Sequence, residues 1–216
     1  MPRTAALLIA FVAALSGARL ASADDALLAD VLHRLGENGG VRARYHERKT
    51  VSLLSAPIES AGTLYFDPPD HLARHVEGAG GAKMAVAGDL VVMRDATGEE
   101  RLRIGESEVA RGLAESFSVA LRGDLALLGS RYETEIQGDL ASWRLRLVPR
   151  SRALARLVDR IVLEGSGGTL RRVELVEVGG DRTTTEFEDV ATGVHFGPEE
   201  RARIFLIDRA PARVDD

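Results

Sequence analysis

The chain has 216 residues, a formal net charge of −5, 45% hydrophobic residues and no cysteine. Without cysteine the protein can form no disulfide and perform no thiol chemistry, so its stability depends on an apolar core, for which the chain is long enough. A mildly acidic chain is a poor partner for phosphate backbones, and we therefore expect no nucleic-acid binding.

The N-terminus has the three parts of a secretory signal peptide. A basic residue, Arg3, precedes an apolar run at 5–15, and the small residues Ala-Ser-Ala at 21–23 form a cleavage site. The apolar run is shorter than the roughly 20 residues that span a bilayer. We therefore predict that residues 1–23 are removed on export, and that the mature chain works in the periplasm without a membrane span or, lacking cysteine, a lipid anchor.

The mature chain begins with a pattern typical of an amphipathic helix at 24–37. Asp24 or Asp25 is the expected N-terminal cap, and Gly39 and Gly40 end the helix. Apolar residues follow at helical spacing: Leu27, Leu28, Val31, Leu32 and Leu35.

Alternating residues then predict strands. In the stretch 41–54, apolar side chains at 41, 43 and 45 face away from basic side chains at 42, 44, 46 and 48. Glycine-rich turns separate further expected strands at 61–66, 71–77, 82–87, 90–94, 100–104, 132–137, 142–148, 159–164, 170–178 and 182–187.

One segment interrupts this series, because apolar residues recur every fourth position at 109, 113, 117 and 121 before Gly123. It predicts a second helix followed by a turn. The order of elements indicates a mainly β (α+β) domain over 24–208, with an antiparallel sheet that is strongly curved or closes on itself and two helices on one face. The charged residues 209–216 are expected to form a disordered tail.

Four motifs resemble one known family. The segment 62–72 (GTLYFDPPDHL) has the pattern G-x-L-x-x-x-x-P-x-x-[LF]. Matches follow in the family's order at 88–90 (GDL), at 143–149 (WRLRLVP) and at 168–187. Together they resemble, over most of the mature chain, the LolA proteins, which are periplasmic carriers of outer-membrane lipoproteins.

The resemblance implies an open β half-barrel whose concave face is covered by helices, with an apolar cavity between them for acyl chains. It also implies a monomer without cofactor, whose partners are an acylated lipoprotein or other lipid-bearing cargo, an inner-membrane release complex and an outer-membrane acceptor. The family has a functional arginine directly before the proline of the first motif, where this chain has Pro68. Both the cargo and the polar link attributed to that arginine are therefore left open.

The walls of such a cavity would be inward-facing apolar residues. The candidates on strands are Leu64, Phe66, Met84, Val86, Trp143, Leu145 and Leu147. The candidates on the covering helices are Leu28, Val31, Leu32, Leu35 and Phe117. An ordinary packed core would use the same residues, so the pattern alone does not decide between core and cavity.

The sequence contains no motif that indicates catalysis: G-x-S-x-G, P-loop and G-x-G-x-x-G are all missing. His71 and His75 have the spacing of two metal ligands on a helix, but the preceding Pro68 and Pro69 indicate a strand, so we expect no metal site. The other histidines are expected to be solvated: His33, His46 and His195.

Basic residues share two strand faces: Arg42, Arg44, Arg48, Arg144 and Arg146. They could meet anionic lipid head groups or an acidic partner, although a solvated outer face is the simpler interpretation.

These observations predict a non-enzymatic periplasmic carrier that shelters acyl chains and moves lipidated cargo from the inner towards the outer membrane. Two alternatives stay open. One is an envelope regulator that senses lipid with the same half-barrel, and the other is a lipid or glycan hydrolase, whose cavity would be lined by converging carboxylates or histidines.

Overall fold

The fold is built on one antiparallel sheet. The structure is a computed structural model that describes residues 23–78, 80–103 and 118–207. The strands of the sheet are β1 (Val41–Thr50), β2 (Ile58–Asp67), β3 (His71–Val76), β4 (Lys83–Ala87), β5 (Leu90–Asp95), β6 (Gly98–Arg103), β7 (Tyr132–Gly138), β8 (Trp143–Pro149), β9 (Val158–Ser166), β10 (Thr169–Glu177) and β11 (Arg182–Thr192). The helices are α1 (Ala23–Gly36), α3 (Leu125–Arg131), α4 (Arg152–Ala155) and α5 (Pro198–Ile204), with a further helical segment at 118–122.

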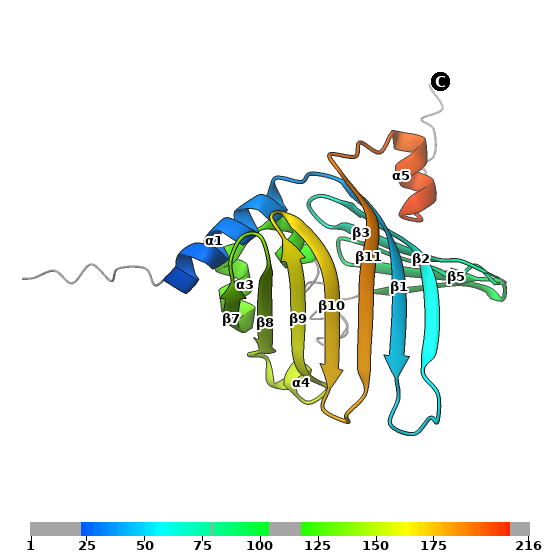
Figure 1. The fold of residues 1–216 in the computed structure, drawn as a ribbon. Coiled ribbons are helices and arrows are strands. Elements are labelled where there is room, and N and C mark those ends of the chain that lie inside the picture. Colours follow the sequence, from blue (N-terminus) through cyan, green and yellow to red (C-terminus); the bar gives the residue numbers. More distant parts are fainter. Residues whose placement is uncertain (1–22, 79, 104–117, 208–216) are drawn as a thin grey trace, which may run out of the picture.

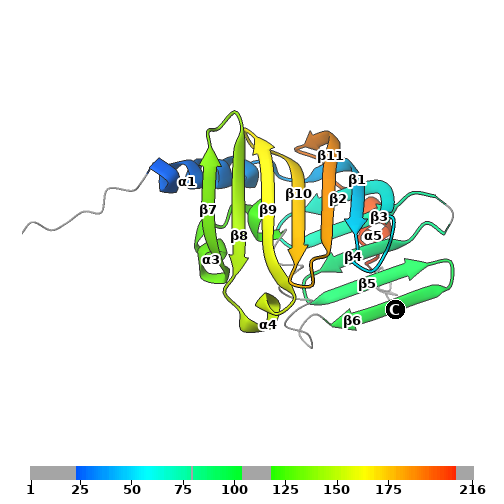
Figure 2. The ribbon, with the colours of Figure 1, turned by 60° about the horizontal axis from the view of Figure 1, so that its bottom comes forward.

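The eleven strands are ordered β6-β5-β4-β3-β2-β1-β11-β10-β9-β8-β7. Each half of the sheet is a meander, and the first and last strands join the halves by pairing through most of their lengths. Strands β7 to β2 stand side by side in Figure 1, while β3 to β6 turn back behind them, and Figure 2 shows the same bend. Because β6 and β7 end the order without pairing to each other, the sheet is an open, strongly curved half-barrel, as predicted.

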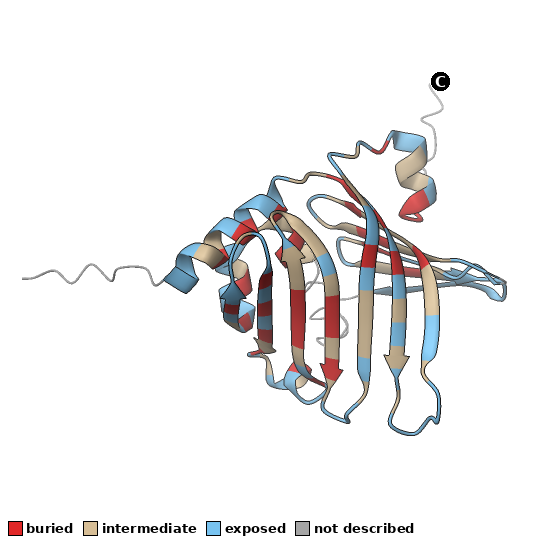
Figure 3. Cartoon of the chain, in the orientation of Figure 1, coloured by how far each residue is buried: buried red, intermediate tan, exposed pale blue. Residues whose placement is uncertain are grey.

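The two faces of the sheet differ in what covers them. Val41, Ala43 and Tyr45 of β1 are buried, and their neighbours Arg42 and Arg44 are exposed. The buried side faces α1, the 118–122 segment and α3 within one apolar cluster. Figure 3 shows buried residues on the inner side of α1 and along the strands that it covers.

Trp143 at the start of β8 anchors this cluster. Its side chain is 2% exposed, and its indole Nε1 donates a hydrogen bond to the Gly167 carbonyl at 2.9 Å. The ring lies so close to Gly165 on β9 that a Cβ there would be 2.2 Å from the ring atom Cζ2. A glycine is therefore required beside the only tryptophan of the chain.

The outer face of β3 to β5 is covered by the C-terminal segment, which the sequence patterns did not predict. Ala73, Ala85 and Val92 pack there against Phe196, Phe205 and other residues of this segment. His75 Nε2 lies 2.9 Å from the Ile204 carbonyl oxygen, and Arg201 Nε lies 2.7 Å from Asp67 Oδ2. The helices expected on the concave face are present there, and α5 adds a helix on the opposite face that was not predicted.

Most expected elements are present, with shifted ends. The helix expected at 24–37 is α1, and the helix break at Gly123 is present, with a left-handed φ of 70° at that glycine. The first strand ends at Thr50 rather than 54, and the last strand runs to Thr192 rather than 187. The candidate residue Phe117 and the expected tail 209–216 lie outside the described residues.

Replacing Gly165 by Ala should destabilise the fold by about 1–3 kcal/mol, because the added methyl overlaps the Trp143 ring and the Thr169 carbonyl. Urea unfolding followed by the fluorescence of Trp143 measures the change in the free energy of unfolding. The control is Gly179→Ala, where an added Cβ meets nothing within 4 Å. Equal stability of the two variants would contradict the close packing at Gly165.

The attachment of the C-terminal segment should weaken in acid. Burial holds the pKa of His75 below 6.5, with Lys83 adding to this and the hydrogen bond to Ile204 opposing it. A lowered pKa means that the folded state favours the neutral ring of His75. The contribution of His75 to the free energy of unfolding is therefore complete above about pH 6.5 and is lost as the pH falls through the folded-state pKa. Thermal unfolding between about pH 7 and pH 5 should therefore show a larger loss of stability for the natural protein than for His75→Gln, and parallel curves would refute this role of His75.

Candidate functional site

The best candidate for a binding site lies between α1 and the concave face of the sheet. Four side chains of α1 face the sheet with at most 7% exposure: Leu28, Val31, Leu32 and Leu35. They pack with Val119 and Ala120 of the 118–122 segment and with inward residues of β1 and β7 to β11. The described packing of these side chains is apolar, so their contact with the sheet depends on shape and burial rather than on directional bonds.

A small cavity remains under these helices. Its open volume is about 20 Å³, which is room for about one water molecule. The lining residues are Leu35, Asn38, Val41, Ala43, Leu64, Leu121, Leu170, Phe187 and Val190. The interior is thus nearly closed, and an acyl chain can enter only if α1 or the 118–122 segment moves away from the sheet.

The two covering helices touch through their backbones. A Cβ at Gly36 would lie 2.7 Å from the Arg122 carbonyl oxygen, and one at Gly123 would lie 2.3 Å from the Leu32 carbonyl oxygen. Such a close approach is possible only for glycine. The helices therefore form one cover, and a movement of α1 is expected to shift the 118–122 segment as well.

The C-terminal end of α1 is fastened to the sheet by polar contacts. Asn38 Nδ2 donates to the Gly168 carbonyl at 2.6 Å, in the turn between β9 and β10. The backbone N–H of Gly193 donates to the Asn38 carbonyl at 2.7 Å, and that of Val194 donates to the Gly40 carbonyl at 2.9 Å. This end of the helix is therefore a fixed point about which the rest of α1 could swing.

The concave face also carries a polar cluster, centred on Arg74 of β3. Its Nε donates to the Tyr45 hydroxyl at 2.8 Å, and its Nη2 contacts Glu47 Oε1 at 2.7 Å and Ser60 Oγ at 2.9 Å. Thr185 Oγ1 donates to the second carboxylate oxygen of Glu47 at 3.1 Å. The partly buried arginine is thus paired with a carboxylate on the inner side of the half-barrel.

The environment of Tyr45 follows from this cluster. Its side chain is 1% exposed, and the guanidinium carbon of Arg74 lies 4.6 Å from the ring centre. Burial raises the pKa of the Tyr45 phenol above 10.0, although the hydrogen bond from Arg74 lowers it. The phenol therefore stays neutral at ordinary pH and is a structural link rather than an acid or base.

The cavity candidates from the sequence occupy three kinds of position. Leu35 and Leu64 line the cavity. The other α1 candidates and the β8 residues Trp143, Leu145 and Leu147 are packed in the main core, while Phe66 and Val86 lie in the adjoining cluster that contains Leu121. Met84 is 38% exposed and is not among the residues that line the cavity.

Several cavity residues were not among the candidates: Val41, Ala43, Leu121, Leu170, Phe187 and Val190. The alternation in 41–45 already placed the side chains of Val41 and Ala43 together on one face of the strand. Val190 could not be predicted as a wall residue, because the last strand was expected to end before it. The polar cluster was missed because Tyr45 and Arg74 lie on strands 29 positions apart in the sequence, and no spacing rule joins them.

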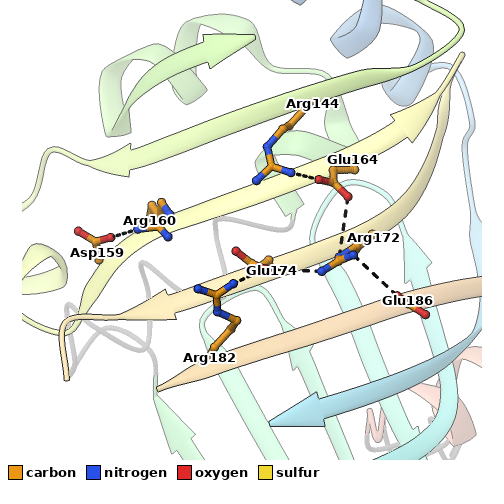
Figure 4. Close-up of polar contacts among 8 residues, drawn as sticks. All are labelled: Arg144, Asp159, Arg160, Glu164, Arg172, Glu174, Arg182 and Glu186. Atoms are coloured by element: carbon orange, nitrogen blue, oxygen red, sulfur yellow. Dashed lines mark hydrogen bonds and ion pairs between the residues drawn. The ribbon is translucent and has the colours of Figure 1, made fainter. Parts of the chain in front are cut away.

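The outer face of β7 to β1 carries the charged residues. Figure 4 shows Arg172 between Glu164, Glu174 and Glu186, with Arg182 reaching Glu174 and Arg144 reaching Glu164. Of the predicted basic positions, Arg44 pairs with Glu77 at 3.8 Å and Arg146 with Glu135 at 3.4 Å. Each exposed pair contributes little to stability. The charged residues in these contacts therefore form a solvated network of ion pairs.

The histidines do not converge on a site. His71 and His75 lie on β3, as expected for a strand, and His71 Nδ1 is 3.1 Å from Asp70 Oδ1. His33 and His46 are exposed and lie near Glu37 and Glu188. Within residues 23–78, 80–103 and 118–207, no group of three or more His, Asp or Glu side chains is placed to hold a metal ion.

A curved open sheet with an apolar concave face under helices defines the class of half-barrel proteins. The family model described as outer membrane lipoprotein carrier protein LolA-like matches residues 18–196. The chain therefore belongs to the LolA-like family. No curated protein matches the chain at a significant level of sequence similarity.

Solved structures with a similar fold include three from different bacteria. A LolA superfamily protein from Nitrosomonas europaea has 11% identity and a TM-score of 0.44, with 79% of this chain and 94% of that chain covered. A DUF1329 family protein from Desulfovibrio piger has 12% identity and a TM-score of 0.48, with 82% and 94% covered. The lipoprotein LppX from Mycobacterium tuberculosis has 14% identity and a TM-score of 0.41, with 80% and 98% covered. All three likenesses concern the fold.

Replacing Asn38 by Ala should loosen the cover. It removes the hydrogen bond to the Gly168 carbonyl, and we expect a loss of about 1 kcal/mol in the free energy of unfolding. Hydrogen exchange followed by mass spectrometry should show faster exchange in α1 with little change in β8 and β9. A uniform increase over the whole sheet would show that Asn38 stabilises the fold in general rather than the cover.

Proposed function

We propose that this protein is a non-enzymatic periplasmic carrier. It shelters the acyl chains of a lipoprotein or another lipid-bearing molecule between the covering helices and the concave face, and it carries them from the inner towards the outer membrane. The observation that supports this most directly is the cavity lining, in which every side chain except that of Asn38 is aliphatic or aromatic. A hydrolase would instead bring carboxylates or histidines together in the cavity.

The energetics favour an exchange of apolar surfaces. Withdrawing the four inward side chains of α1 would expose apolar surface at a cost of about 1.5–3 kcal/mol each, or on the order of 10 kcal/mol together. An acyl chain of about sixteen carbons gains roughly 0.8 kcal/mol for each methylene removed from water, again on the order of 10 kcal/mol. Because these terms are similar, cargo can replace the cover without a source of energy within the protein, and the cover can later expel the cargo.

The proposed location follows from the predicted signal peptide and from the family. Among the described residues, no helix is both long and apolar enough to cross a membrane. The proposed partners are an inner-membrane complex that releases cargo to the carrier and an outer-membrane acceptor that takes it, with the carrier itself a monomer.

Native mass spectrometry of the protein recovered from the periplasm of its own organism tests the proposal. We expect a fraction of the protein to carry a lipid or lipoprotein. We also expect the mass of the polypeptide to be that of a chain that begins at Asp24. Protein that is always empty, and that also takes up no fluorescent fatty acid, would overturn the proposal.

The cavity residues provide a sharper test. Leu64→Asn or Leu170→Asn places an amide against bound acyl chains, and we expect about tenfold weaker binding of a fluorescent fatty acid. Leu102→Asn is the matched control, because Leu102 is 46% exposed on the edge strand β6. If the cavity variants bound the fatty acid as tightly as the Leu102→Asn control, the bound fatty acid would lie outside this cavity.

A further inference from the structure

Exposed aliphatic side chains gather at one end of the half-barrel. Leu53 is 93% exposed, Leu54 51% and Ile58 54%, all in or beside the loop between β1 and β2. Val178 in the turn between β10 and β11 is 57% exposed, and Leu157 before β9 is 50% exposed. We refer to these five residues as the apolar tip. Figure 1 shows all three connections at the same lower end of the sheet, and Figure 3 shows the β1–β2 loop exposed.

The three connections are bonded to one another. Ser52 donates to Asp181 Oδ1 through its backbone N–H at 2.9 Å and through its hydroxyl at 2.8 Å. The Val178 N–H donates to the Leu157 carbonyl at 2.9 Å. A salt bridge of 3.3 Å between Lys49 and Glu177 joins the two strand ends. The apolar tip is therefore held in place by neighbouring loops, and the leucines are presented at a fixed end of the molecule.

A turn directs the two leucines outward. The Leu54 N–H donates to the Val51 carbonyl at 2.9 Å, so residues 51–54 form a tight turn with Ser52 and Leu53 at its centre and Leu54 at its end. Water-exposed leucines at a loop apex gain nothing for folding, since neither the core nor the cover receives them. Exposed aliphatic side chains that gather in one place mark a contact with another molecule.

The charges around the apolar tip identify that partner. The segments 48–60, 150–160 and 177–182, which form this end, contain seven Lys or Arg and four Asp or Glu. The whole chain has the opposite balance, with 28 basic and 33 acidic residues. Lys49, Arg160 and Arg182 are paired with carboxylates, and the segments keep a net excess of basic residues. Aliphatic side chains beside such an excess match the boundary between the acyl region and the head groups of an anionic bilayer. A protein groove would not require this local reversal of charge.

We propose that the apolar tip inserts Leu53 and Leu54 into the surface of an anionic bilayer, with nearby basic residues such as Arg48 and Arg156 facing the lipid head groups. The contact is peripheral and reversible, because a few aliphatic side chains give only weak partitioning. This membrane contact extends the proposed function and rests on it, because a carrier of acyl chains collects its cargo where acyl chains lie.

Flotation with vesicles tests this contact, using protein recovered from the periplasm. Vesicles of phosphatidylglycerol and phosphatidylethanolamine should bind the protein, and high salt should weaken the binding. Neutral phosphatidylcholine vesicles should bind it less. The double variant Leu53→Ser/Leu54→Ser should bind anionic vesicles at least about tenfold more weakly. The matched control Leu102→Ser, at an exposed leucine on β6, should bind like the natural protein.

Three outcomes would overturn the proposal. One is no binding to either kind of vesicle, which would leave a partner protein as the target of the apolar tip. Another is equal binding by the double variant and the natural protein. The third is an equal loss in Leu102→Ser, which would indicate a general surface effect. Uptake of a fluorescent fatty acid without vesicles, measured on the same samples, separates the two proposals: uptake without vesicle binding refutes the tip alone, and vesicle binding without uptake refutes the carrier.

Discussion

The open edge of the sheet imposes the constraint on which the rest of the molecule depends. A closed barrel would bury its interior by pairing its first and last strands, but here β6 and β7 stay apart and the concave face needs another cover. The chain supplies it from α1, the 118–122 segment and α3, which pack on that face through apolar side chains. A cover made from a separate element can be withdrawn without breaking the hydrogen bonds of the sheet. The same feature that completes the core thus permits access to it.

Along the inner side of β1, the side chains change from apolar to polar. Val41 and Ala43 line the cavity beneath the helices, Tyr45 accepts a hydrogen bond from Arg74, and Glu47 pairs with the same arginine. Further along, Lys49 bonds to Glu177, beside the apolar tip. Within one strand the environment therefore changes from apolar to polar over a few residues. A molecule with an acyl chain and a polar head has the same order of properties, and the strand could accommodate it lengthwise.

Much of this fold could be predicted from the sequence, because alternation and glycine turns are local signals. The strands from β2 to β10 were expected within a few residues of their observed ends, and α1 within one. The end of β11 was missed because the pairing of β1 with β11 shifts its register between Arg42 and Arg44, and Asp189 has a positive φ of 49°. Such a bulge interrupts the alternation from which strand length is inferred. Helix α5 was missed although Pro198, Glu199 and Glu200 form a recognisable N-terminal signal.

The site was harder to predict than the fold, since inward orientation does not distinguish a wall from a core. Leu64 and Trp143 both point inward on predicted strands, yet only Leu64 borders the cavity. The difference depends on where the cover ends, which is set by contacts such as Gly36 with Arg122 and Asn38 with Gly168 between distant parts of the chain. Pairings such as Tyr45 with Arg74 likewise arise from strand register, which single-strand patterns do not contain.

The positions of the fixed point and of the apolar tip suggest how covering and contact could act together. Asn38 holds α1 at the turn between β9 and β10, whereas the tip lies at the turns that follow β1 and β10, at the other end of the same strands. A helix that swings about Asn38 moves least at that end. If the tip rests on a bilayer, the fastened end of the cover is the part farthest from the lipid, and the polar cluster of Arg74 lies between them. Contact with the membrane would then leave the anchor of the cover undisturbed.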